Sequence, residues 1–131
     1  MKGHLDLSRI HFTGKIAHTD LTRALQASSA HVYYTYPYVL SWSLLEAMAC
    51  GALVLASDTA PVLDVIEDGV NGLLGNFFDV DSLASQLIEV CEHPDRYEPV
   101  RQAARRTAEA YDIARACLPA WLSLVDDLLT A

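Results

Sequence analysis

A run of apolar residues at positions 52–57, ALVLAS, constrains the fold of this chain more than any other stretch. The run begins after Gly51 and is followed by the polar residues Asp58 and Thr59. It shows no alternation between polar and apolar positions, so both faces of a strand formed here should be covered. A strand buried on both faces is typical of a parallel sheet with helices on each side. The run therefore predicts an α/β protein.

The rest of the chain alternates between strand-like and helix-like patterns. Stretches rich in β-branched, aromatic or alternating apolar residues predict further strands at 9–13, 31–36 and 71–75. Amphipathic or cap-bounded stretches predict helices at 18–30, 43–50, 61–68, 79–93, 95–111 and 112–131. Thr19 is the expected N-cap of the first helix, and Ser41 or Ser43 opens the second. Pro37 should stop the strand at 31–36, and Pro119 should kink or split the last helix.

This order of elements predicts the fold class: α/β, with a doubly wound, Rossmann-like parallel sheet flanked by helices. The sequence shows no internal repeat or linker, so residues 1–131 are expected to form a single domain. Ligands of such sheets bind at the carboxyl ends of the strands. Loops 14–19, 36–43 and 57–61 hold that position and are the predicted ligand-binding loops.

Composition and charge argue against several classes of partner. The 131 residues are 52% hydrophobic and carry 17 acids against 9 bases, a formal net charge of −8. Nucleic acids and anionic membranes attract basic surfaces, so neither is an expected partner. No apolar run reaches the length of a transmembrane helix, and the first residues lack the apolar core of a signal peptide. The three cysteines are odd in number and far apart, which fits reduced thiols in the cytoplasm.

Common catalytic motifs are absent from the sequence. It contains no G-x-G-x-x-G, P-loop, H-E-x-x-H or G-x-S-x-G pattern. Its five histidines show no metal-ligand spacing, so surface or structural roles are expected for them and no metal site is predicted. Asp58 stands where a receiver-like flavodoxin fold would place a phosphorylatable aspartate, but the acidic pair that such a fold needs is absent.

A single acid, Glu46, interrupts the apolar segment SLLEAMA at 43–49. If the helix opens near Ser43, Glu46 lies in its first turn, where the helix N-terminus favours a carboxylate. Two interpretations stay open: the carboxylate caps the amides of its own helix, or it accepts hydrogen bonds from a vicinal diol such as a ribose. Backbone N–H groups at 40–44 are placed to form a nest for phosphate. The second interpretation predicts a pocket for a nucleotide-like ligand.

The segment 37–74 carries a more specific pattern, PYVLSWSLLEAMACGALVLASDTAPVLDVIEDGVNGLL. It resembles the donor-nucleotide region of retaining glycosyltransferases with the GT-B fold, the glycosyl transferases group 1 or glycogen-synthase-like family. The family pattern L-E-A-M-A-x-G matches residues 45–51, and N-G-L-L matches residues 71–74. The resemblance extends from residue 9 to about residue 111.

The resemblance implies that the chain binds a nucleotide-sugar and is part of an enzyme that transfers the sugar to an acceptor hydroxyl. Glu46 takes the position of the second glutamate of the family's pair, which holds the ribose hydroxyls, and Tyr38 takes the position of the first. No metal or other cofactor is implied, since the nucleotide-sugar is a substrate. The other residues implied in nucleotide and diphosphate binding are Gly14, Lys15 and Ile16 near the base, and Ser41, Trp42, Ser43, Leu44 and Leu45 along the diphosphate and sugar.

The sequence departs from the family pattern at the sugar end of the site. The first glutamate should stand eight positions before Glu46, and Tyr38 is found there. That glutamate contacts the transferred sugar, whereas a tyrosine offers only one hydroxyl. The family's glycine-aromatic-glycine turn reads Val39-Leu40-Ser41, so side chains stand where bare backbone usually approaches the ligand. Asp64 replaces a glutamate further along. The sugar end is therefore expected to differ from that of the family.

The resemblance also implies parts that this sequence does not show. Members of the family have an N-terminal acceptor-binding domain, and an Arg/Lys pair earlier in the second domain neutralises the diphosphate. We therefore expect a truncated C-terminal donor-binding domain, the incomplete C-terminal half of a GT-B fold, which is inactive alone and binds diphosphate weakly. The full-length protein is expected to be cytoplasmic, with peripheral association at the inner membrane.

Two further expectations concern partners. The bare interdomain face and the open sheet edge predict a homodimer formed through these surfaces. A competing hypothesis is a degenerate, non-catalytic α/β domain with an interaction or regulatory role, and Tyr38 is the residue that favours it.

Overall fold

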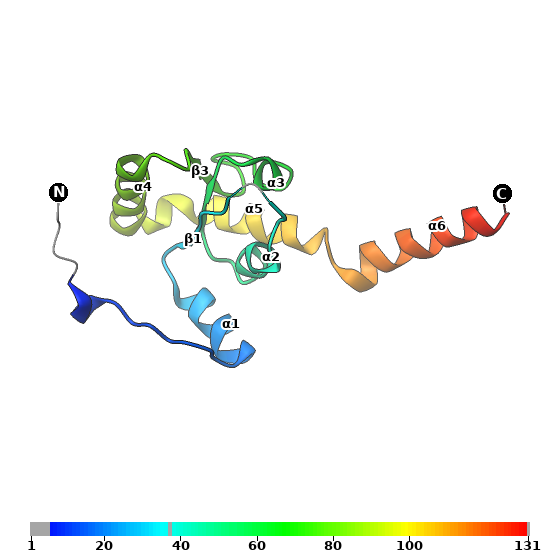
Figure 1. The fold of residues 1–131 in the computed structure, drawn as a ribbon, viewed down its shortest axis with the longest axis horizontal. Coiled ribbons are helices and arrows are strands. Elements are labelled where there is room, and N and C mark those ends of the chain that lie inside the picture. The colour runs from blue at the N-terminus through cyan, green and yellow to red at the C-terminus, as the bar shows by residue number, and fades with distance from the viewer. Residues whose placement is uncertain (1–5, 37, 131) are drawn as a thin grey trace.

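Three parallel strands form the sheet of the computed structural model, which describes residues 6–36 and 38–130 (Figure 1). The strands are β1 (His31–Tyr33), β2 (Val54–Ser57) and β3 (Leu73–Gly75), and they lie in the order β1-β2-β3. Leu55 of the central strand is in register with Val32 of β1 and Leu73 of β3. The parallel sheet and its flanking helices confirm the predicted fold class.

Helices follow each strand, as predicted. None of the described helices combines the length and the apolar character needed to cross a membrane. The α-helices are α1 (His18–Ala27), α2 (Trp42–Ala49), α3 (Ala60–Leu63), α4 (Val80–Glu92), α5 (Glu98–Glu109) and α6 (Leu118–Thr130), with 3-10 turns at Leu7–Arg9 and Pro94–Tyr97 and a π-helical turn at Ile113–Cys117.

The central strand is covered on both faces, which confirms the interpretation of its apolar run. Residues 54–57 are all 0% exposed. Val54 and Ala56 belong to a hydrophobic cluster with residues of α1, α2, α3 and α5. Leu53 and Leu55 belong to a second cluster, which includes Val90 of α4. Because successive side chains of a strand point to opposite faces, one short strand serves both layers of the core.

The prediction of a strand at 9–13 is wrong. A 3-10 turn occupies Leu7–Arg9, and the following residues run in irregular backbone up to α1, apart from the sheet (Figure 1). Phe12 is 85% exposed there. A strand is stable only when a neighbour accepts its backbone hydrogen bonds, and among the described residues β1 pairs with β2 alone. The alternating pattern therefore has no strand to join.

Several predicted boundaries also change. Ala17, not Thr19, is the N-cap of α1, and it makes no side-chain capping bond. The helix predicted at 61–68 ends at Leu63, since α3 covers only four residues. Pro119 is the second residue of α6, and helical backbone runs without a break from the π-helical turn at Ile113–Cys117 into α6, so the helix is not split there. Pro37, predicted to stop a strand, lies outside the described residues.

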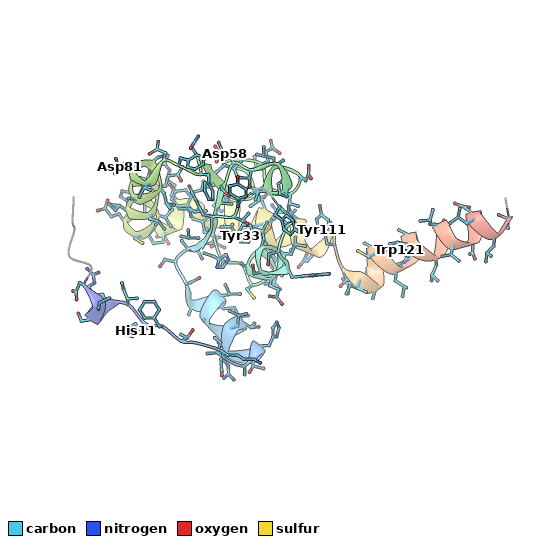
Figure 2. All side chains as sticks on the ribbon, viewed as in Figure 1. His11, Tyr33, Asp58, Asp81, Tyr111 and Trp121 are labelled. Carbon is cyan, nitrogen blue, oxygen red and sulfur yellow. The ribbon has the colours of Figure 1, made fainter. Side chains whose placement is uncertain are left out.

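The last helix, α6, extends away from the rest of the described structure, and Figure 2 shows Trp121 on this isolated segment. None of its residues is buried against the described part of the chain. Its exposed large apolar side chains are Leu118, Trp121, Leu122, Leu124, Val125, Leu128 and Leu129. α6 therefore carries an uncovered apolar surface among the described residues.

Candidate functional site

The start of α2 is fixed by Ser41, one of the two openings that the sequence predicts. Ser41 has extended backbone angles, and its Oγ accepts a hydrogen bond from the Ser43 backbone N–H at 3.3 Å. Its own N–H donates to the Tyr33 hydroxyl of β1 at 2.9 Å. The loop before α2 is thus tied to the end of the first strand, close to the carboxyl edge of the sheet.

The predicted phosphate nest at 40–44 is only partly open. The Ser41 N–H already donates to the Tyr33 hydroxyl, and the Ser43 N–H donates to Ser41 Oγ. The Leu44 N–H donates to the Ser41 carbonyl at 3.1 Å. The N–H groups of Leu40 and Trp42 have no hydrogen-bond partner within 6–36 and 38–130. Anion binding here would therefore use the two amides that have no partner among the described residues, or would replace the long bond from Ser43.

Glu46 lies further along the helix than the sequence predicts. It is the fifth residue of α2, and the first turn of this helix contains no acid. Its Oε1 is 3.0 Å from Nε2 of His18 on α1. The interpretation that Glu46 caps its own helix is wrong, because Ser41 performs the capping. The pKa of the Cys50 thiol, one helical turn after Glu46, is raised mainly by burial and to a smaller extent by the negative charge of Glu46.

His18 belongs to the candidate site through its contact with Glu46, and the sequence analysis missed it. It was assigned a surface or structural role like the other histidines, yet it holds the one acid that the sequence singles out. The side chains of His18 and Glu46 are 72% and 40% exposed, so the pair is open to a ligand. A signal was available, since His18 directly follows the predicted base-binding loop and begins a helix adjacent to α2.

The loop at Gly14–Ile16 lies just before this pair. Gly14 has a positive φ of 61°, which a glycine adopts without strain and which turns the chain toward α1. All three residues are exposed. Because His18 begins the helix that follows and contacts Glu46, the structure brings this predicted loop to the same end of α1 as the predicted ribose-binding carboxylate.

Tyr38 stands apart from these contacts. Its side chain is 85% exposed, and Val39 beside it is 68% exposed. No hydrogen bond joins Tyr38 to another described residue. The side chains of Leu44 and Leu45, in contrast, pack in or against the core, so only their backbone can face a ligand.

A buried hydroxyl fixes the carboxyl ends of β1 and β2 relative to each other. Ser57 Oγ accepts the Thr35 N–H at 3.2 Å and donates to the Thr35 carbonyl at 3.1 Å. Its Oγ is also 3.4 Å from the Thr59 hydroxyl. These contacts set the spacing between the loops that leave the two strands, which is where parallel sheets bind ligands.

A pocket of about 250 Å³ opens at this carboxyl edge (Asp58 is labelled in Figure 2). It is lined by residues that follow each of the three strands: Tyr36 after β1, Asp58 and Thr59 after β2, and Asn76, Phe77 and Phe78 after β3. The loop at 76–78 was not among the predicted ligand loops, although the rule that selected the others applies to it equally. No described group of three or more His, Cys, Asp or Glu side chains is placed to hold a metal ion.

Sequence comparisons find related proteins for most of the chain. Residues 3–107 match the family described as glycosyl transferases group 1. An uncharacterized glycosyltransferase of Methanocaldococcus jannaschii is 32% identical over 85 residues, which is 64% of this chain and 22% of that protein. The sulfoquinovosyl transferase SQD2 of Arabidopsis thaliana is 29% identical over 104 residues, which is 77% of this chain and 20% of that protein.

Solved structures share the fold. Sucrose-phosphate synthase of Thermosynechococcus elongatus matches with a TM-score of 0.81 and 22% identity, over 95% of this chain and 31% of that one. Anabaena HepE in complex with UDP and glucose matches with a TM-score of 0.76 and 22% identity, over 94% of this chain and 32% of that one. The chain thus spans about a fifth of the length of the curated relatives and about a third of these solved chains.

Proposed function

The chain belongs to the glycosyl transferases group 1 family, and we propose that it forms the nucleotide-sugar-binding part of a glycosyltransferase. Its sheet and helices have the fold found in the C-terminal part of GT-B glycosyltransferases. The observation that carries the proposal is the position of Glu46. Its half-exposed carboxylate is held by His18 at 3.0 Å, at the end of α1 where the Gly14–Ile16 loop arrives.

The chemistry of this arrangement suits a nucleotide. A carboxylate can accept two hydrogen bonds from adjacent hydroxyls, which is the arrangement that the ribose of a nucleotide presents. Contact with His18 fixes one carboxylate oxygen and so limits the rotation of the Glu46 side chain. The exposed loop before α1 then edges the base, and the amides of Leu40 and Trp42, which have no partner among the described residues, face the diphosphate. HepE has been solved with UDP and with UDP-glucose, which supports the same ligand class here.

We assign a retaining transfer reaction to the complete protein. The bond between the sugar C1 and the diphosphate oxygen breaks, and C1 forms a bond with the acceptor oxygen on the same face. The proton of the acceptor hydroxyl leaves with the released nucleoside diphosphate. Acceptor binding belongs to the complete protein, because this chain spans about a fifth of the length of its curated relatives. We expect the chain alone to bind the donor without transferring its sugar.

Titration calorimetry with UDP, GDP and ADP tests the donor site. We expect wild type to bind at least one of these nucleotides weakly, and Glu46→Ala to lower that affinity about tenfold or more, since charge-assisted hydrogen bonds to the ribose are lost.

Glu92→Ala is a matched control for this titration. It removes an exposed carboxylate on α4 and changes the net charge equally, so it should leave nucleotide affinity unchanged. Equal affinities for wild type and Glu46→Ala, or no binding to either, would exclude the donor site as described.

Tyr38 favours a second candidate, a non-catalytic α/β domain that binds a partner instead of transferring sugar. The residue stands where the family has a glutamate, and it is 85% exposed with no hydrogen bond to a described residue. A degenerate domain would still show the fold and the family match. The two candidates separate in the titration above, because a degenerate site need not retain a nucleotide affinity that depends on Glu46.

We also propose that a second copy of the chain covers the bare surfaces of this one. α6 exposes apolar side chains along its length, and β1 leaves its outer edge unpaired among the described residues. Contiguous apolar surface and open strand edges both favour self-association. Light scattering should show a mass near twice that of the monomer as concentration rises. A constant monomer mass at the highest concentration would exclude this homodimer.

A further inference from the structure

A second pocket, of about 170 Å³, lies at the edge of the sheet opposite the candidate donor site. Gly51 precedes β2, and Arg101 of α5 donates a hydrogen bond to the Ser29 carbonyl just before β1, so the pocket stands at the amino ends of these strands. The loops assigned to the donor leave the carboxyl ends instead. The residues that line this arginine pocket are Gly51, Glu98, Arg101, Gln102 and Arg105.

Positive charge is concentrated around the arginine pocket, although the chain as a whole is acidic. Residues 96–106 contain four of the nine lysines and arginines of the chain and only one acid, Glu98. Arg101 and Arg105 are four residues apart in α5, so their side chains lie on the same face of the helix. An anion in the pocket would therefore meet two guanidinium groups at close range, while most of the acids that give the chain its net charge are further away and screened by salt.

Both guanidinium groups are anchored and still have unused donors. A guanidinium carries five N–H donors. Arg101 uses one of them on the Ser29 carbonyl, and the Arg105 Nε donates to Glu109 Oε1 at 3.3 Å. Their other side-chain N–H groups have no partner within 6–36 and 38–130. Two guanidinium groups held in this way can each donate paired hydrogen bonds to the oxygens of a phosphate.

The end of α2 does not account for the two arginines. Cationic side chains often pair with the last carbonyls of a helix. In α2, however, the carbonyls of Glu46, Ala47 and Met48 already accept backbone N–H groups of residues 50–52. The space beside the helix end is also open, because a Cβ atom added at Gly51 would meet no atom of a more distant residue within 4 Å. The arginines therefore face a space that a ligand can enter.

Glu98 restricts the kind of anion that fits. It lies in the first turn of α5, and its Oε1 accepts a hydrogen bond from Gln102 Nε2 at 2.9 Å. Its carboxylate repels a ligand made only of charged oxygens but can accept a hydrogen bond from a hydroxyl group. The volume of about 170 Å³ lies below the roughly 300–1,000 Å³ of sites for drug-sized ligands. A small molecule with one phosphate and a hydroxyl group meets these requirements.

We propose that the arginine pocket binds a small phosphate monoester. Arg101 and Arg105 hold the phosphate oxygens, and the Glu98 carboxylate accepts a hydrogen bond from a hydroxyl group of the same molecule. None of the residues assigned to the donor nucleotide lines this pocket. The inference is therefore independent of the proposed glycosyltransferase function.

Nuclear magnetic resonance of the ¹⁵N-labelled full chain tests the proposal, with glycerol 3-phosphate and inorganic phosphate as probes at constant ionic strength. We expect both to shift the amide resonances of residues 50–52 and 98–105 in a saturable way. Glycerol 3-phosphate should bind about threefold or more tightly than inorganic phosphate, since it adds a hydrogen bond to Glu98. Glu98→Ala should abolish this preference, because the acceptor for the hydroxyl group is lost.

Arg105→Gln should weaken the binding of glycerol 3-phosphate about tenfold or more, because charge-assisted hydrogen bonds are lost. Arg105 is exposed, and its contact with Glu109 is a surface pair, so the substitution should leave the fold intact. Arg106→Gln is the matched control. It removes the same charge from an exposed neighbour that does not line the pocket, and it should change the affinity by no more than about twofold.

The map of shifted resonances separates this pocket from the donor site. The inference is overturned if the probes shift no amide, or shift only residues 40–44, where the diphosphate is proposed to bind. It is also overturned if Arg105→Gln binds glycerol 3-phosphate as wild type does, if Arg106→Gln weakens binding equally, or if wild type shows no preference for the ester over inorganic phosphate.

Discussion

Leu55→Ala should lower the free energy of unfolding by about 2–5 kcal/mol, the range for truncating a fully buried leucine. Leu55 is 0% exposed on the central strand and packs in the cluster that contains Val90 and Val100. The sheet has three strands, so the loss falls on the one strand that both neighbours require for pairing. For a domain whose total stability is about 5–15 kcal/mol, this single change removes a large share.

Urea unfolding followed by circular dichroism measures this effect. Leu63→Ala is the matched control, because it removes the same atoms from a side chain that is 52% exposed at the end of α3. It should change the free energy of unfolding by no more than about 0.5 kcal/mol. If both variants lose the same stability, β2 is not the centre of the core.

The buried strand could be predicted because its evidence is local. A strand formed by an apolar run without alternation is stable where helices cover both faces of its sheet. The run can be recognised without reference to any other part of the chain. The strand predicted at 9–13 could not be judged from its local sequence. Five alternating residues show that a segment suits a sheet edge, but they do not show whether a neighbouring strand is present. In the structure none of the described strands pairs with it, and Phe12 stays exposed.

The residues of the candidate site also differ in whether the local sequence reveals them. Glu46 was singled out because one acid in an apolar helix is conspicuous in the sequence, and Ser41, one of the two predicted openings, is the N-cap of α2. His18 was missed because its importance arises from the packing of α1 against α2, which brings together residues 28 positions apart. The predicted position of Glu46 within its helix was wrong because the helix begins earlier than assumed. The prediction counted from Ser43, while Ser41 caps the helix and so shifts every residue after it.

Tyr38→Glu should raise the affinity for UDP-glucose relative to UDP by about tenfold or more. By the family resemblance, position 38 faces the transferred sugar, and a carboxylate there makes charge-assisted hydrogen bonds worth about 1.5–3 kcal/mol. Tyr38 is 85% exposed, so the change should leave the fold intact. The affinity for UDP itself should fall slightly in the variant, because the added charge increases a net charge of −8 near a diphosphate. The ratio of the two affinities is therefore the quantity to measure.

Val39→Glu separates position from charge in this experiment. Val39 is 68% exposed beside Tyr38, and the substitution adds the same charge one residue further on. Only the glutamate at 38 should raise the ratio of UDP-glucose to UDP affinity in calorimetry. If both variants raise it, the effect is general electrostatics. If neither does, residue 38 does not face the transferred sugar, and the non-catalytic candidate gains support, because restoring the family's glutamate would then restore no part of the sugar site.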